Sequence, residues 1–188
     1  MTAEIYSNDF NRVIDATKFC TSTNILDRAM TRYIKLEFNA EHQEMTAFSC
    51  DGYRFSIEHA AIANCDENFV AYIKPTIKLP RSQYFVIMVD DNEVIFRGND
   101  LSFGFTQPTT IEEFNYKKII DGLPPRVLKI GFNGNYLLET LKAAKISAGN
   151  TFKKPVILEF HGEDKPLIIR TNKEDIKLVL PLRIKDEV

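Results

Sequence analysis

Three stretches of this chain repeat one order of elements, a strand and a helix followed by three strands. The first copy begins with "AEIYS" and a helix over residues 8–20, and continues with "RYIKLEF", "EMTAFSC" and "YRFSIEHAAI". The second begins with "ENFVAYIK" and "PTIKLPR", and continues with "YFVIMVD", "EVIFRG" and "LSFGFTQ". The third begins with "RVLKIGF" and a helix over residues 135–145, and continues with "PVILEFH", "PLIIRT" and "DIKLVLPLRI". Repeated strand-helix-three-strand units predict an α+β fold, with antiparallel sheets backed by a few helices.

The joints between the expected strands carry residues that favour hairpin turns. Asn, Asp and Gly take positive φ or bond their own backbone, so they suit tight reversals of the chain. These joints are Asn39-Ala40-Glu41, Asp90-Asp91-Asn92, Gly98-Asn99-Asp100, Gly162-Glu163-Asp164 and Asn172-Lys173-Glu174. We therefore expect neighbouring strands to pair antiparallel.

Two segments show the apolar spacing of a helix that covers a core. The apolar face of the first consists of Phe10, Val13, Ile14 and Thr17. That of the second consists of Leu137, Leu138, Leu141 and Ala144. Asn8 and Asn135 are the expected N-caps. In the middle copy, Pro75 and Pro80 interrupt the corresponding segment, so its helix is expected to be degraded.

The segment 107–126, "QPTTIEEFNYKKIIDGLPPR", is the best candidate for a linker because it is rich in Pro and Thr. We expect one domain over residues 1–122, made of two copies, and a half domain over residues 123–188, made of one.

The stretch "SCDGYRFSIEHA" predicts a hairpin with Asp51-Gly52 as a two-residue turn. This turn places Cys50 opposite Tyr53 and Phe48 opposite Phe55, on a largely apolar face. The other face is expected to be mostly polar and carries Met45, Ala47, Ser49, Arg54, Ser56 and Glu58.

Catalytic chemistry finds little support in this hairpin. Ser49, Asp51 and His59 would have to meet, but His59 lies roughly 20 Å beyond the turn along an extended strand. No His, Cys, Asp or Glu residues have metal-ligand spacing, and "GFNGN" lacks the frame of a phosphate-binding loop. The sequence therefore predicts no enzyme, no metal site and no cofactor.

Charge and cysteine content restrict the partners and the compartment. Lys and Arg number 24 against 26 Asp and Glu, a formal net charge of -2, so any contact with nucleic acid needs a local basic face. The three cysteines form no CxxC pair, there is no signal-peptide pattern, and no apolar run is long enough to cross a bilayer. A reduced, cytoplasmic protein without membrane contact is expected.

The C-terminal segment "KLVLPLRI" is unusually apolar for a last strand. Leu178, Leu180, Leu182 and Ile184 alternate along it, and Pro181 cannot donate to a strand ladder. The strand therefore lies at an edge or leaves the sheet at the proline. Its leucines either close a core or line a groove.

Four motifs in order along the chain resemble the bacterial sliding clamp, the β subunit of the replicative DNA polymerase III. "VIDATKFCTS" resembles the first helix of the family's middle domain, and "CDGYRFS" its Asp-Gly-His-Arg-Leu turn. "FNYKKIIDGLP" resembles the linker that closes that domain. "IGFNGNYLLETLKAAK" through "DIKLVLPLRI" resembles the last helix and the terminal Met-Pro-Met-Arg-Leu strand.

This resemblance implies a non-enzymatic, DNA-clamp-like processivity factor that tethers DNA polymerase and other replication or repair proteins through short peptide motifs. In the family, the peptide pocket forms between the middle-domain hairpin and the terminal strand. Carried over, the peptide-binding residues are Cys50, Gly52, Tyr53, Arg54, Phe55, Leu180, Pro181, Leu182, Arg183 and Ile184. Tyr53 in place of histidine, and leucines in place of both methionines, imply an altered peptide preference and a stiffer groove.

The family also contacts double-stranded DNA non-specifically, through helices that line the hole of a ring. Carried over, the DNA-binding residues are Arg12, Lys18, Arg28, Arg32, Lys142 and Lys145. The chain departs from the family in size, because it has three units where family members have six. Ring closure then requires a homo-oligomer. The alternatives are a clamp mimic that forms no ring and competes for clamp-binding peptides, and a small hydrolase.

Overall fold

The computed structural model describes residues 1–77, 79, 81–99, 101–112, 114–148, 155–171 and 174–183. The chain divides into two compact units, Met1–Tyr116 and Lys117–Val188. This division lies six residues before the domain boundary expected after Gly122, which stays a prediction.

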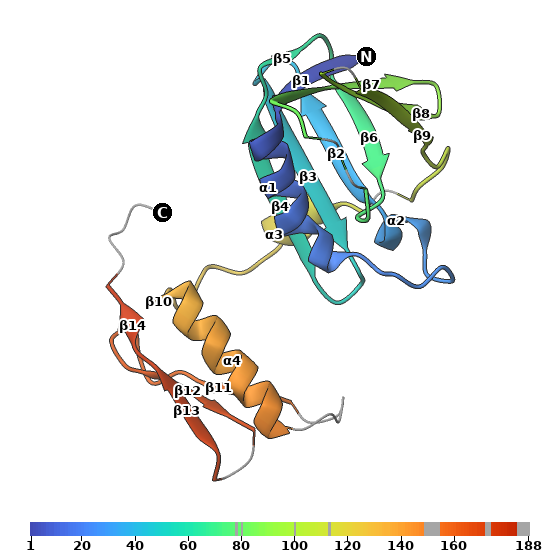
Figure 1. Cartoon of the computed structure of the whole chain (residues 1–188). Helices are drawn as coiled ribbons and strands as arrows, with labels where there is room; N and C mark the ends of the chain where they lie inside the picture. The colour runs from blue at the N-terminus through green and yellow to red at the C-terminus, as the bar shows by residue number, and fades with distance from the viewer. Residues whose placement is uncertain are drawn as a thin grey trace. The chain divides into compact units, whose positions relative to one another are not determined.

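The first unit contains two antiparallel sheets (Figure 1). A four-stranded sheet has the order β4-β3-β2-β6, with strands β2 (Ile34–Asn39), β3 (Glu44–Cys50), β4 (Phe55–Ala61) and β6 (Phe69–Ile73). A five-stranded sheet has the order β5-β1-β7-β8-β9, with strands β1 (Thr2–Tyr6), β5 (Asn64–Cys65), β7 (Tyr84–Asp90), β8 (Glu93–Gly98) and β9 (Leu101–Thr106). The helical segments are α1 (Ser7–Thr17), the 3-10 turn η1 (Lys18–Cys20) and α2 (Ala29–Arg32). Helix α3 (Tyr116–Asp121) begins at the last residue of this unit and continues into the second.

Two of the repeated copies build this unit by exchanging their leading strands. We call residues 2–65 the first module and residues 69–106 the second module. The leading strand of the first module, β1, pairs with β7 of the second, and the leading strand of the second, β6, pairs with β2 of the first. Among the described residues between β6 and β7 no helix forms, as the two prolines predict.

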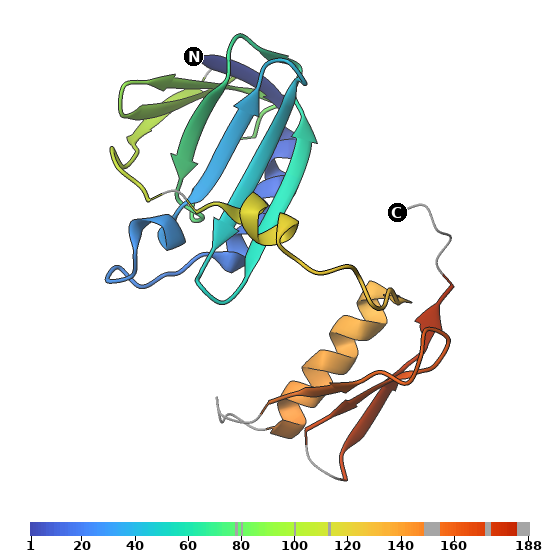
Figure 2. The same cartoon turned by 180° about the vertical axis from the view of Figure 1, so that it is seen from behind.

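Both sheets contribute their inner faces to one core, which α1 covers (Figure 2). The apolar face predicted for α1 is confirmed, because its four residues are all buried. Phe10 packs edge-on against Phe85 and Phe96, with ring centroids 5.9 and 5.5 Å away. Each buried aromatic side chain contributes roughly 1.5–3 kcal/mol to folding, so this cluster is a main source of the unit's stability.

The second unit contains the third module, residues 131–182, in which a helix packs on a three-stranded sheet (Figure 2). Its elements are β10 (Gly131–Phe132), α4 (Gly134–Ala148), β11 (Ile157–Glu159), β12 (Leu167–Arg170), β13 (Ile176–Val179) and β14 (Pro181–Leu182). The sheet has the order β11-β12-β13, and β10 pairs separately with β14. Its core consists of Ala144, Leu167, Ile169 and Val179.

Both predicted helix caps are wrong. Helix α1 begins at Ser7, with Asn8 already inside it, and no side-chain bond caps it. Helix α4 begins at Gly134, and its cap is Asn133, whose Oδ1 accepts hydrogen bonds from the backbone N–H groups of Asn135 at 3.0 Å and Tyr136 at 3.2 Å. Leu138 also departs from the prediction, since it is exposed beside the helix face that packs on the core.

Among the residues that the structure describes, none of the helices has the length and apolar content to span a bilayer.

Candidate functional site

The β3–β4 hairpin turns one residue later than the sequence predicts. Cys50 lies opposite Phe55, so Gly52 and Tyr53 form the turn, and the expected pairing of Cys50 with Tyr53 is wrong by two residues. Gly52 has φ +90°, a left-handed conformation that favours glycine. Asp51 Oδ1 accepts the N–H groups of Tyr53 at 3.0 Å and Arg54 at 3.1 Å. These bonds fix the turn, and because the shift is even each side chain keeps its face.

Both faces of β3 are covered, contrary to the expected polar outer face. Met45, Ala47 and Ser49 are fully buried, and Ser49 Oγ donates to Thr17 O of α1 at 2.6 Å. On the opposite face, the Phe48 ring stacks on Phe114 and Tyr116, with centroids 5.6 and 4.8 Å away. The polar interpretation failed because α1 comes from a distant part of the sequence and closes over this face.

Arg54 pairs with a carboxylate and an aromatic ring at the hairpin. Its Nε donates to Asp51 Oδ2 at 2.8 Å, and this hydrogen bond lowers the pKa of the Asp51 carboxyl. The Arg54 guanidinium also lies over the Phe19 ring, 5.3 Å from its centroid. Tyr53 at the tip is 99% exposed and is therefore open to a partner.

Part of the predicted hairpin site lines a hollow of about 680 Å³ in the first unit. Its lining consists of Leu26, Asp27, Arg28, Met30, Thr31, Cys50, Asp51, Gly52, Tyr53 and Phe114. Three predicted peptide-binding residues are therefore together, whereas Arg54 and Phe55 lie outside the lining. The segment 26–31 was missed as part of this site, since its sequence has no feature that points to the hairpin.

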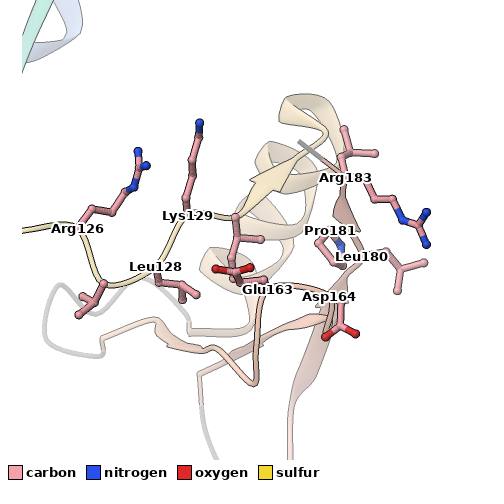
Figure 3. Close-up of a pocket in the computed structure, with 11 residues that line it drawn as sticks. Arg126, Leu128, Lys129, Glu163, Asp164, Leu180, Pro181 and Arg183 are labelled. Carbon is pink, nitrogen blue, oxygen red and sulfur yellow. The ribbon is translucent and has the colours of Figure 1, made fainter. Parts of the chain in front are cut away.

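The terminal segment lines a second hollow, of about 780 Å³, in the second unit (Figure 3). Leu180, Pro181, Leu182 and Arg183 form one wall. The other lining residues are Arg126, Val127, Leu128, Lys129, Ile130, Glu163 and Asp164. Ile184, the fifth predicted residue of this segment, lies outside the described residues.

The leucines of the terminal segment are exposed to solvent. Leu178, Leu180 and Leu182 are all exposed, and Val179 between them is buried. The strand leaves the three-stranded sheet after Val179 and pairs with β10 at Pro181, as the proline predicts. Exposure of these leucines favours the groove-lining alternative over the core-closing one.

Three of the six basic residues predicted to contact DNA are paired with acids on the surface. Arg12 bonds Glu58 at 3.3 Å, Lys18 pairs with Asp15, and Arg28 pairs with Glu112 at 3.5 Å. Exposed pairs of this kind are weak, roughly 0–1 kcal/mol, and leave the cations accessible.

The other three of these residues differ in exposure. Lys142 and Lys145 are exposed on α4. Arg32 is half-buried, and its Nε has no hydrogen-bond partner among the described residues.

The residues considered for catalysis have separate partners. Ser49 bonds Thr17, Asp51 bonds Arg54, and His59 Nδ1 lies 3.0 Å from Glu44 Oε1. Within the described residues, no group of three or more His, Cys, Asp or Glu side chains is placed to hold a metal ion.

The three cysteines are all free and buried. Burial raises the pKa of the Cys20 and Cys65 thiols, which favours the unreactive protonated form.

No family model and no curated protein matches this chain. Its structure is similar to that of a putative DNA polymerase III β subunit from Eubacterium rectale, with a TM-score of 0.80 and 18% identity over 96% of this chain and 50% of that one. It is also similar to the β subunit from Thermotoga maritima (TM-score 0.72, 16% identity, 96% and 50% covered). A Helicobacter pylori β clamp bound to a DNA ligase peptide gives a TM-score of 0.70 at 13% identity (96% and 49% covered).

The chain thus spans about half the length of these solved relatives. Its antiparallel sheets and few helices are consistent with the fold of these relatives. The chain therefore has the fold of the bacterial sliding clamps, the β subunits of DNA polymerase III, over about half of their length.

Proposed function

We propose that this chain is a clamp-like, non-enzymatic tether that binds short peptide motifs of DNA replication proteins. The observation that carries the proposal is the terminal segment, where apolar side chains stay exposed in a hollow beside basic ones. An extended peptide with apolar anchors and an acidic residue matches this chemistry. The clamp fold supports the same reading, since the H. pylori clamp of this fold was solved with a DNA ligase peptide bound.

In the terminal hollow, Leu180 and Leu182 are the residues that would contact an apolar side chain of the peptide. Both are more than half exposed, and covering them with an apolar anchor would remove that area from water. Arg183 on the same wall supplies a cation for an acidic peptide residue. Glu163 and Asp164 also line this hollow, so we expect it to discriminate against peptides with acids on that side.

The hairpin hollow contributes the second set of contacts in this proposal. Tyr53 offers an almost fully exposed ring, and Gly52 leaves its backbone open, since no atom lies within 4 Å of a Cβ built there. Arg54 is held by Asp51 and Phe19, so its guanidinium would meet a peptide without first losing much conformational freedom. We propose that this hollow also binds peptide.

A binding titration tests the peptide site. The probe is a fluorescein-labelled peptide with the sequence of the DNA ligase segment that the H. pylori clamp binds, titrated with the full chain. Leu182→Asp is expected to weaken binding by at least about thirtyfold, because it places a charge where an apolar anchor sits.

The matched control is Leu178→Asp on the same terminal segment. Leu178 is 52% exposed against 54% for Leu182, but it does not line the hollow, so its affinity should stay at the wild-type value. Tyr53→Ala tests the hairpin set in the same way, and truncating so exposed a residue leaves the fold intact. Equal affinity of wild type, Leu182→Asp and Tyr53→Ala would discard the site.

In the same proposal, the chain contacts double-stranded DNA through exposed cations and works in the cytoplasm. Free, buried cysteines suit a reducing compartment.

The ring-forming clamp and the mimic that forms no ring differ in one measurable property: a clamp that encircles DNA stays on closed circular DNA and slides off linear DNA. Equal retention on both would favour the mimic.

A further inference from the structure

The third module repeats the first module strand for strand. In the first module, β1 precedes helix α1 and pairs with β5, the short strand that follows β4. In the third, β10 precedes helix α4 and pairs with β14, the short strand that follows β13. Strands β11, β12 and β13 correspond to β2, β3 and β4, with the same antiparallel neighbours. The internal pairing of the two modules is therefore the same.

The external pairing differs. In the first unit, β2 has a second neighbour, β6, and β1 has a second neighbour, β7, both from the second module. In the described part of the second unit, β11 pairs only with β12, and β10 pairs only with β14. Within the residues that the structure describes, the third module thus has two open strand edges, at the positions where the first module receives its partner. Unpaired edges of this kind are sites where another strand adds.

The side chains at these open edges are apolar, exposed on β11 and partly buried on β10. They surround a hollow of about 360 Å³ lined only by apolar residues: Leu128, Ile130, Phe132, Leu137, Leu141, Leu158, Phe160 and Leu167. Leu158 and Phe160 are 44% and 48% exposed, whereas Leu36 and Phe38, at the corresponding positions of the first module, are 0% and 2% exposed. The hollow is the half of a core that the second module fills in the first unit.

We propose that the second units of two copies of this chain pair with each other, each placing its β10 beside β11 of the other. The first unit supplies the precedent, since its two modules already exchange leading strands in this reciprocal way. A second copy carries both missing edges, so one two-fold contact closes both hollows at once.

The register of this contact follows from the first unit. There, Ile5 lies opposite Phe85 and Ala3 opposite Ile87, counting back from the start of the helix. Phe132 and Ile130 stand at the same distances before helix α4 as Ile5 and Ala3 before helix α1. Matching Val156 and Leu158 to Phe85 and Ile87 then places Phe132 opposite Val156 of the second copy, Ile130 opposite Leu158 and Leu128 opposite Phe160. Every one of these pairs is apolar, and all of these side chains except that of Val156 line the hollow.

Charge complementarity favours a second copy over any other apolar partner. In the same register, Lys129 of each chain lies opposite Glu159 of the other, on the face away from the hollow. Opposite charges directly across an antiparallel pair stabilise it, and like charges destabilise it. Two-fold symmetry forms this pair twice.

Charge reversal tests the contact in the full chain, with the solution mass measured by sedimentation equilibrium. Wild type is expected to form a concentration-dependent species of at least two chains. Lys129→Glu and Glu159→Lys alone each place like charges opposite one another at two points, so each should raise the dimer dissociation constant by about tenfold or more. Mixing the two variants restores Lys–Glu pairs at both points and should restore a dimer that contains one chain of each.

Glu159→Lys also removes the hydrogen bond between Arg170 and Glu159 of the same chain. This bond is missing from that variant both alone and in the mixture, so its loss cannot explain a dimer that forms only in the mixture. Lys74→Glu, an equal charge reversal on the first unit, should associate like wild type. A monomeric wild type at every soluble concentration, or a mixture that associates no better than its components, would overturn the proposal. These readouts involve neither peptide nor DNA, so the pairing stands or falls separately from the proposed function.

Discussion

Gly52 and Gly134 have the same free space around them but different backbones. Apart from the neighbouring residues and the helix's own backbone, no atom lies within 4 Å of a Cβ built on either glycine, yet only Gly52 has a positive φ, at +90°. At the residue scale, the hairpin turn therefore depends on backbone conformation and on the Asp51 carboxylate that accepts the N–H groups of the next residues. The Asp-Gly pair in the sequence predicts a turn here, but the pair alone does not fix which two residues form its tip.

Alanine at these two glycines should change stability in opposite directions. Gly52→Ala is expected to cost about 1–2 kcal/mol, because an L side chain is strained at this φ. Gly134→Ala, at the start of α4, should stabilise the chain by roughly 0.5 kcal/mol through lower entropy of the unfolded state. Urea unfolding of the two variants measures both changes. A loss of stability in both would mean that space rather than φ decides the effect.

At the scale of elements, the positions of helices and strands follow from the sequence pattern, whereas their ends do not. The spacing of Phe10, Val13 and Ile14 predicts the buried face of α1, and the structure confirms it. Each predicted cap is wrong by two residues, because the cap is set by where the backbone leaves helical geometry. A row of neighbouring cap candidates such as "NGN" does not show where that happens.

The cap of α4 can be tested with two asparagines two residues apart. Asn133→Ala removes the Oδ1 that accepts two N–H groups and is expected to cost about 1 kcal/mol. Asn135→Ala is the matched control, since that exposed residue uses only its backbone in the cap, and it should change stability by less than about 0.5 kcal/mol. Thermal or urea unfolding distinguishes them. Equal effects would contradict the assignment of Asn133 as the cap.

At the scale of the whole molecule, the modules combine in a way that decides what remains exposed. Two modules close on each other in the first unit, and the described part of the third has an apolar hollow and two open strand edges. Two chains paired through their third modules would contain six modules, and each chain spans about half the length of its solved relatives. The proposed pair of chains would therefore have about the same total length of clamp-fold chain as one of those relatives.

DNA contact is a property of the assembled surface and should show in the salt dependence of binding. The double variant Lys142→Glu, Lys145→Glu removes two cations that are exposed on α4. If each contacts a phosphate, the slope of log K against log salt should fall by about two units, since each contact releases a counterion. Fluorescence anisotropy with a duplex of arbitrary sequence measures the slope, and Lys74→Glu should leave it unchanged. An unchanged slope in the double variant would remove these lysines from the proposed DNA surface.

The sequence by itself determined the order of elements, the antiparallel hairpins, the repeat of one module and the resemblance to the sliding clamp. These depend on local periodicity and turn residues, which a single stretch of chain carries. Only the tertiary structure decided that Ser49 is buried beneath α1, that the terminal leucines stay exposed, and that leading strands pair across modules. Each of these results from contacts between residues far apart along the chain, and no local pattern records which distant segment covers a given face.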